Sequence, residues 1–174
     1  KVNANELIEQ NYGHIILANG IIPRKLDIDG ANHPKVVSYA DVLQNKVTVG
    51  QSVAVIGAGG IGFDVAEYLT HQAATEDQIT NFLKEWGVDH NYQHAGGITK
   101  PISTGSPREV YLLKRSSGKH GSTLGKTTGW IHKASLINKG VKMLADVTYL
   151  KVDDYGLHIS IKDVEQTLHV DHIV

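Results

Sequence analysis

Residues 52–69 read SVAVIGAGGIGFDVAEYL, and this stretch decides the fold of the chain. Its first five residues form an apolar run rich in β-branched side chains, which is typical of a buried parallel strand. Its last ten residues place Phe63, Ala66 and Leu69 on one face of a helix. The stretch therefore predicts a strand, a tight turn and a helix in direct succession.

The turn carries glycines in the pattern G-x-G-x-x-G, at Gly57, Gly59 and Gly62. The first glycine would turn the chain off the strand, the second would let a pyrophosphate approach the backbone, and the third would let the helix pack closely on the strand. The phosphates would then meet unpaired N–H groups at the positive end of the helix dipole. A glycine-rich turn without a ligand is the alternative, but its position between a strand and a helix favours nucleotide binding. The candidate cofactor-binding residues here are Gly57, Ala58, Gly59, Gly60, Ile61 and Gly62.

Composition excludes several classes of function. The 174-residue chain has a net charge of −1 and no cysteine, so it holds no disulfide, thiolate-bound metal or iron–sulfur cluster of its own. Its near-neutral charge argues against a nucleic-acid partner, and no apolar run approaches the roughly 18 residues of a membrane helix. We expect a cytoplasmic protein without a membrane partner. The last residues resemble the middle of a strand, so we also expect a piece of a longer protein.

Shorter elements are expected before the glycine motif. Residues 1–13 contain a short polar helix or coil, and residues 14–20 form a buried strand that ends on small residues. Ser38 is a plausible cap for a short helix over residues 39–44.

A long insertion follows the motif helix. Thr75 would cap a helix that Gly87 ends. The apolar face of this helix consists of Ile79, Phe82, Leu83 and Trp86. Residues 88–107 then form an irregular loop that is longer than compact domains usually contain.

Parallel strands resume after the insertion. Residues 110–113 form a buried strand, a helix capped by Thr127 or Thr128 runs to Gly140, and residues 141–144 form a third strand.

From Val147 the apolar period changes to two, which predicts an antiparallel meander of three strands with turns at residues 153–156 and 163–166. The fold class is therefore α/β, with a Rossmann-like parallel sheet flanked by helices plus an antiparallel β-meander.

The end of the second strand indicates which nucleotide is bound. It carries Lys114 and Arg115, and no acidic residue occurs between Val110 and Ala145. NAD-binding domains place an acid there for the ribose 2′-hydroxyl, whereas NADP-binding domains present basic groups to the 2′-phosphate. We therefore predict NADPH rather than NADH, with Lys114 and Arg115 as cofactor-binding residues. The alternative is that these basic residues are solvated side chains without a ligand. This alternative is enough to explain Lys133, Lys139 and Lys142.

Two segments of the chain are alike, residues 12–20 (YGHIILANG) and residues 170–174 (VDHIV), as strands entering and leaving an inserted nucleotide domain would be. Residues 16–24 (ILANGIIPR), 56–64 (IGAGGIGFD) and 124–132 (LGKTTGWIH) resemble the bacterial NADPH-dependent 2,4-dienoyl-CoA reductases. These are flavoproteins fused to an old-yellow-enzyme barrel and built with two dinucleotide-binding domains. The similarity extends over essentially the whole chain.

The resemblance implies a flavin-dependent oxidoreductase that reduces 2,4-dienoyl-CoA in unsaturated fatty acid β-oxidation. Hydride would pass from NADPH to FAD, and electrons would pass through a 4Fe-4S cluster to FMN in the barrel that holds the substrate. This chain would be the NADPH-binding module, without a catalytic residue of its own and with the FAD and barrel domains of the same parent chain as partners. Asn19 and Gly20, where the wider superfamily commonly has Thr-Gly, are further candidate cofactor-binding residues.

The resemblance also implies a division of the chain. Residues 1–35 would be the tail of the preceding FAD-domain half with a linker, and residues 36–170 the NADPH-binding domain with an insertion at 71–108. Residues 171–174 would begin the strand that returns to the FAD domain.

Other chemistry has less support in the sequence. Of ten histidines, only His90 and His94 have i, i+4 spacing, and they lie in an expected loop without clustered acids, so we expect no metal site. Trp130 and His132 either approach the cofactor or belong to an amphipathic helix. A function of another class stays open, namely a nucleotide-sensing regulatory domain that binds without turnover and needs no flavin.

Overall fold

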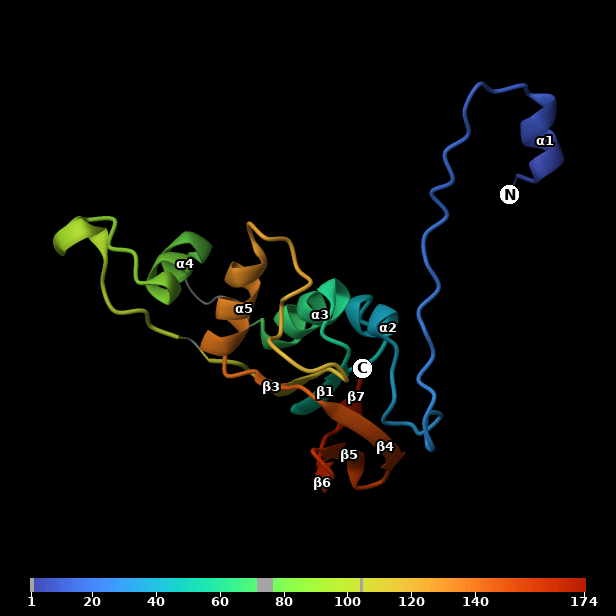
Figure 1. The fold of residues 1–174 in the computed structure, drawn as a ribbon. Helices are drawn as coiled ribbons and strands as arrows, with labels where there is room; N and C mark the ends of the chain where they lie inside the picture. The colour runs from blue at the N-terminus through green and yellow to red at the C-terminus, as the bar shows by residue number, and fades with distance from the viewer. Residues whose placement is uncertain (1, 72–76, 104) are drawn as a thin grey trace.

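The computed structural model describes residues 2–71, 77–103 and 105–174. At its centre a parallel sheet has helices on one face and an antiparallel sheet beneath the other (Figure 1). The helices are α1 (Ala4–Glu9), α2 (Tyr39–Leu43), α3 (Gly60–Thr70), α4 (Gln78–Trp86) and α5 (Gly129–Asn138), with a 3₁₀ turn at Ala95–Gly97. The strands are β1 (Ser52–Ile56), β2 (Glu109–Leu113), β3 (Lys142–Leu144), β4 (Val147–Asp153), β5 (Gly156–Ile161), β6 (Val164–Leu168) and β7 (His172–Ile173).

The parallel sheet confirms the fold class predicted from the sequence. In the described residues its strand order is β3-β2-β1-β7, and each neighbouring pair is parallel. The register places Ile56 opposite Leu113, so β1 and β2 end at the same level. The glycine turn after β1 and the basic segment after β2 therefore begin at one edge of the sheet.

Each face of the sheet packs against a different layer, because successive side chains of a strand point to opposite faces. On one face α3 packs against the sheet and against α5. This core contains Val53, Val55, Phe63, Val65, Ala66, Leu69, Val110, Leu112 and Leu136. On the other face the core joins the sheet to the meander through Ala54, Leu113, Val147, Val152, Leu157, Ile159, Leu168, Val170 and Ile173. The expected face of α3, with Phe63, Ala66 and Leu69, is confirmed as buried.

The meander of β4, β5 and β6 is confirmed as antiparallel. Its first turn lies within residues 153–156, as predicted. The second turn was predicted at residues 163–166, but it consists of Lys162 and Asp163, whose φ angles are 51° and 63°. Two residues with positive φ match the twist of a hairpin, so Val164 can already begin β6.

The strand β7 belongs to the sheet that carries the glycine motif. His172 and Ile173 pair in parallel with Val53 and Ala54 of β1. Residues 35–37 extend this edge, since the Ile173 amide donates to the Lys35 carbonyl at 2.8 Å. Residues 171–174, which we expected to begin the strand that returns to the FAD domain, thus have their hydrogen-bonding partner in β1. The division of the chain into domains stays a prediction.

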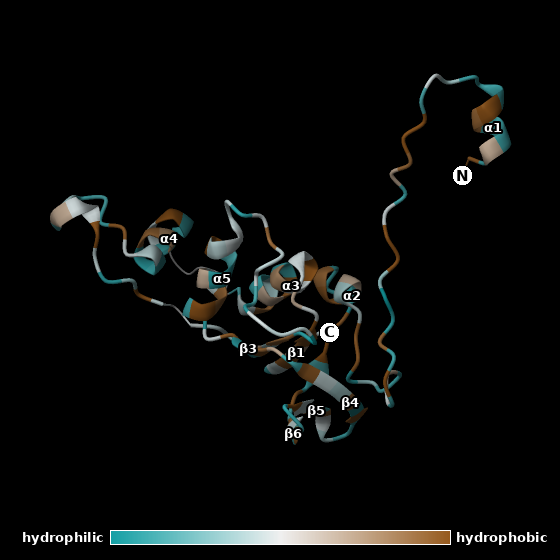
Figure 2. Ribbon diagram, in the orientation of Figure 1, coloured by the Kyte–Doolittle hydropathy of each residue, from teal (hydrophilic) through white to brown (hydrophobic). Residues whose placement is uncertain are grey.

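The buried strand predicted at residues 14–20 is wrong for this structure. The chain after α1 is an exposed, extended arm that leads from α1 to the rest of the protein and lies apart from the sheet (Figure 1), and Ile16 and Ile22 are 91% and 95% exposed. The arm carries apolar residues that are brown in Figure 2. A strand needs a neighbour that completes its backbone hydrogen bonds, and no described strand lies beside the arm. The short polar helix before it is confirmed as α1.

Short elements near the motif follow their sequence signals. Ser38 caps α2 by accepting a hydrogen bond from the Asp41 amide at 3.1 Å, as predicted. Thr128 is the residue before α5, and its side chain makes no capping hydrogen bond. Within α5, Leu136 is fully buried, whereas Ile137 is largely exposed.

The insertion contains the predicted helix, α4. Asp77 caps it by accepting from the Thr80 amide at 3.1 Å, and Gly87 ends it with a φ of 65°. Thr75, which we proposed as the cap, lies outside the described residues. No residue of α4 is buried, so the helix contributes little to the core.

Among the described residues, none of the helices has the length and apolar character needed to cross a membrane.

Replacement of Gly62 by alanine should lower the free energy of unfolding by about 1 to 3 kcal/mol, the range for overpacking. The new Cβ would lie 1.8 Å from the Gly57 carbonyl oxygen, so the turn or α3 must move. Urea unfolding followed by circular dichroism measures the change. Gly60→Ala is the matched control, because no atom lies within 4 Å of its Cβ position and alanine favours a helix. A Gly62→Ala protein as stable as the wild type would contradict this packing.

Candidate nucleotide-binding site

The amino end of α3 is bare. Gly59 precedes the helix, no described side chain caps it, and no acidic residue occurs in its first turn. Gly59 and Gly60 are exposed, and beyond the adjoining backbone no atom lies within 4 Å of where a Cβ would be at either position. The first-turn N–H groups and the positive end of the helix dipole are therefore available to an anion.

The three positions of the motif differ in why a glycine is present. Gly57 has a φ of 108°, which only glycine adopts without strain, so its role in turning the chain is confirmed. Gly62 lies so close to the Gly57 carbonyl that no Cβ would fit, which confirms the expected close packing. Gly59 has ordinary extended angles and open space around it, so the fold itself does not require glycine there. Close approach by a ligand is the remaining physical reason for a residue without a side chain.

The end of β2 lies directly beside this turn. The Gly57 amide donates to the Leu113 carbonyl at 2.9 Å, which joins the first residue of the turn to the last residue of β2. Lys114 and Arg115 follow immediately, so the structure brings these sequence-predicted basic residues to the edge that holds the bare helix end. This edge therefore combines the positive end of a helix dipole with two cationic residues, which suits a polyanionic ligand.

Lys114 and Arg115 have different surroundings. The Lys114 ammonium donates to the carbonyls of Ser117 at 2.9 Å and Lys119 at 3.1 Å. The Arg115 guanidinium is exposed and makes no hydrogen bond to a described residue, and its charge acts on the phenol of Tyr149 in β4. The Lys114 ammonium is therefore held by its own loop, whereas the Arg115 side chain is exposed.

His120 is a buried polar residue that sequence reasoning missed. It is 7% exposed, and its Nε2 donates to the Leu112 carbonyl at 3.1 Å. Burial is the main cause that lowers the pKa of His120, and the charges of Lys114 and Lys133 lower it further, so the ring is neutral at pH 7. A histidine between glycines in an expected loop gave no signal of burial.

The side chains proposed to approach the cofactor from α5 have structural partners. His132 donates through Nδ1 to a carboxylate oxygen of Glu67 at 2.9 Å and so links α5 to α3. Trp130 is 63% exposed, and its indole N–H donates to the Thr127 carbonyl at 3.1 Å. The helix-packing interpretation accounts for His132, whereas the exposed Trp130 contributes nothing to the core.

The remaining candidates lie elsewhere. Asn19 and Gly20 are exposed in the extended arm, and this arm lies apart from α3 (Figure 1). His94 bonds through Nδ1 to Asp89 at 2.8 Å within the insertion. In the part of the chain that the structure describes, no three His, Cys, Asp or Glu side chains gather into a metal site.

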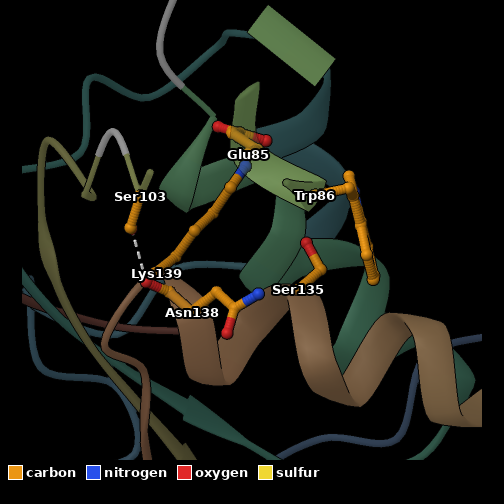
Figure 3. Close-up of a pocket in the computed structure, with 6 residues that line it drawn as sticks. All are labelled: Glu85, Trp86, Ser103, Ser135, Asn138 and Lys139. Atoms are coloured by element: carbon orange, nitrogen blue, oxygen red, sulfur yellow. Dashed lines mark hydrogen bonds between the residues drawn. The ribbon is translucent and has the colours of Figure 1, made fainter. Parts of the chain in front are cut away.

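A small hollow lies between α4 and the carboxyl half of α5 (Figure 3). It has a volume of about 10 Å³, and Ser103 donates to the Asn138 carbonyl at its wall at 2.6 Å. Its lining consists of Glu85, Trp86, Ser103, Ser135, Asn138 and Lys139. This volume is about that of one water, and the hollow is at the end of α5 opposite its glycine-flanked start, so it is no nucleotide site.

Comparison with known proteins places this chain in a family. The family model described as "Pyridine nucleotide-disulphide oxidoreductase" matches residues 1–174. A metal reductase of Desulforamulus reducens is 21% identical over 166 residues, which cover 95% of this chain and 24% of that protein. A cinnamate reductase of Clostridium sporogenes is 43% identical over 58 residues, which cover 33% of this chain and 8% of that protein. The chain thus spans a quarter or less of these relatives.

Solved structures share the fold. A 2-naphthoyl-CoA reductase in complex with 2-naphthoyl-CoA matches with a TM-score of 0.62 and 19% identity, over 88% of this chain and 18% of that chain. A 6-hydroxypseudooxynicotine amine oxidase of Pseudomonas geniculata N1 matches with a TM-score of 0.64 and 16% identity, over 100% of this chain and 23% of that chain. At these identities the likeness concerns the fold alone.

The titration of Tyr149 tests the surroundings of Arg115. Burial raises the pKa of Tyr149 to about 12, and the Arg115 charge lowers it. The tyrosine pKa in the unfolded chain is about 10. The unfolded state therefore loses the proton first, and the free energy of unfolding should fall as pH rises from 10 to 12. The difference in phenolate absorbance between wild type and Tyr149→Phe should have its midpoint near pH 12. In an Arg115→Ala background that midpoint should move higher, whereas a midpoint near 10 would mean a solvated phenol.

Proposed function

Because this chain belongs to the pyridine nucleotide-disulphide oxidoreductase family, we propose that it is the NADPH-binding module of a flavin-dependent reductase. The family comprises redox enzymes that use FAD and a nicotinamide nucleotide. The observation that carries the proposal is the bare amino end of α3 beside the basic end of β2.

In this proposal the chain's residues bind and orient the nucleotide. The N–H groups of the first turn of α3 hold the pyrophosphate, and Gly59 leaves room for it. Arg115 binds the 2′-phosphate, because its guanidinium is exposed and has no hydrogen-bonding partner among the described residues. NADPH, when bound, supplies a hydride for the flavin.

The other cofactors belong to the rest of a longer protein in this proposal. The described residues contain one G-x-G-x-x-G turn, between β1 and α3, and this turn fits one dinucleotide. The chain has no cysteine, so a 4Fe-4S cluster must be held outside it. FAD, FMN, the cluster and the substrate would be bound by other domains of the same parent chain, among them a barrel. The relatives are four or more times longer than this chain, which leaves room for such domains.

We propose 2,4-dienoyl-CoA of unsaturated fatty acid β-oxidation as the substrate of the parent enzyme, in the cytoplasm. Support comes from the segments at residues 16–24, 56–64 and 124–132 that resemble dienoyl-CoA reductases. The name of the relative cinnamate reductase agrees in chemistry, because cinnamate, like a 2,4-dienoyl thioester, has a C=C bond conjugated to its carbonyl carbon.

Arg115→Ala should weaken NADPH binding by about 1 to 3 kcal/mol, the value of a hydrogen bond between charged groups, with little change for NADH. Calorimetric titration with both nucleotides measures the two affinities. Lys100→Ala removes a charge from the exposed insertion and is the control that should leave both unchanged. Equal losses for NADPH and NADH would contradict the phosphate role of Arg115.

Gly59→Val should abolish binding of both nucleotides, because the side chain would occupy the space proposed for the pyrophosphate. The free energy of unfolding should change by about 1 kcal/mol or less, since Gly59 has ordinary backbone angles and open space. Gly13→Val makes the same substitution in the exposed arm and should bind as the wild type does. Undiminished binding by the Gly59→Val protein would contradict the site.

A further inference from the structure

The segment between β2 and α5 is closed into a turn by one side chain. Lys114 Nζ donates to the carbonyls of Ser117 at 2.9 Å and Lys119 at 3.1 Å. An ammonium has three N–H donors, so this contact uses two of them. Within the turn Gly118 has a φ of 84°, which lets the backbone point both carbonyls at the ammonium.

Both ends of this turn are fixed to the sheet. At its start the Val147 amide donates to the Lys114 carbonyl at 3.1 Å, and the Asp146 amide donates to the Ser116 carbonyl at 3.3 Å. At its end the buried His120 ring donates to the Leu112 carbonyl at 3.1 Å. Residues 115–119 therefore have little freedom except at their side chains, provided that Lys114 holds the turn closed.

The sequence predicts that Lys114 and Arg115 both bind the cofactor, but the two side chains differ in the structure. The Lys114 ammonium is turned into its own loop, whereas the Arg115 guanidinium is exposed and makes no hydrogen bond to a described residue. The carbonyl dipoles also offset the repulsion between the Lys114 ammonium and the nearby cations Arg115 and Lys119. Removing the ammonium would leave two carbonyls without their partner and the turn without its closure.

We propose that Lys114 is a positioning residue for 2′-phosphate recognition: it does not touch the phosphate, but closes the 115–119 turn and so fixes the backbone from which Arg115 binds it. The inference rests on the proposed NADPH function. Its energetic basis is that the turn is ordered before the nucleotide arrives, so the cost of ordering does not reduce the affinity.

A double-mutant cycle on the full chain distinguishes positioning from direct contact. Lys114→Met, Arg115→Ala and the double variant are titrated with NADPH and NADH by calorimetry. Lys114→Met should weaken NADPH binding about tenfold and leave NADH binding unchanged. In the Arg115→Ala background the same change should have little further effect, because no guanidinium remains to be positioned. Lys114→Arg should restore most of the NADPH affinity, since a guanidinium can also donate to two carbonyls.

A second measurement needs no nucleotide. Backbone ¹⁵N relaxation should show greater picosecond-to-nanosecond motion for residues 115–119 in Lys114→Met, but not in Lys114→Arg or Arg115→Ala. Additive losses of NADPH affinity, or an unchanged turn in Lys114→Met, would overturn the positioning role while leaving the NADPH site intact. Wild-type protein that does not prefer NADPH over NADH would overturn the proposed specificity, and the phosphate role of Lys114 with it.

Discussion

The close approach of α3 to the turn before it is the constraint on which the rest of the structure depends. The Gly62 position has no room for a Cβ, because the Gly57 carbonyl oxygen would lie 1.8 Å from it. This contact seats the helix on β1 and buries Phe63 and Leu69 against the sheet. It also directs the amino end of the helix outward at the carboxyl edge of the strands, the edge at which open α/β sheets bind their ligands.

The parallel register gives that edge its charge. Because Ile56 lies opposite Leu113, the glycine turn and the basic turn begin side by side, joined by the hydrogen bond from Gly57 to Leu113. The glycine turn and the basic residues after β2 are each weak signals in the sequence. In the structure they lie side by side and give this edge a positive potential. Lys114 and His120 make hydrogen bonds to the backbone around the basic turn, whereas the Arg115 side chain is exposed. Family membership implies a nicotinamide nucleotide, and the exposed amino end of α3 suits its phosphates.

The two layers around the sheet account for the described core, and two segments remain outside it. The arm between α1 and residue 28 and the helix α4 expose apolar residues, among them Ile16, Ile22 and Phe82. The chain spans a quarter or less of the relatives with which it was compared. In the proposed function, the arm leads to the flavin-binding part of a longer chain.

The sequence by itself determined the local elements: the strand, turn and helix at residues 52–69, the strands after the insertion, and the change to period two in the meander. These follow from apolar spacing and from glycine, whose effects act between residues near in the chain. Only the tertiary structure decided that His172–Ile173 join β1 and that residues 14–20 form no strand, because a strand exists through a partner distant in sequence. Tertiary structure likewise decided that Lys114 closes a turn while Arg115 stays exposed. The two adjacent cations look alike in the sequence. In the fold, two backbone carbonyls accept hydrogen bonds from Lys114, whereas Arg115 makes no hydrogen bond to a described residue and its charge acts on Tyr149.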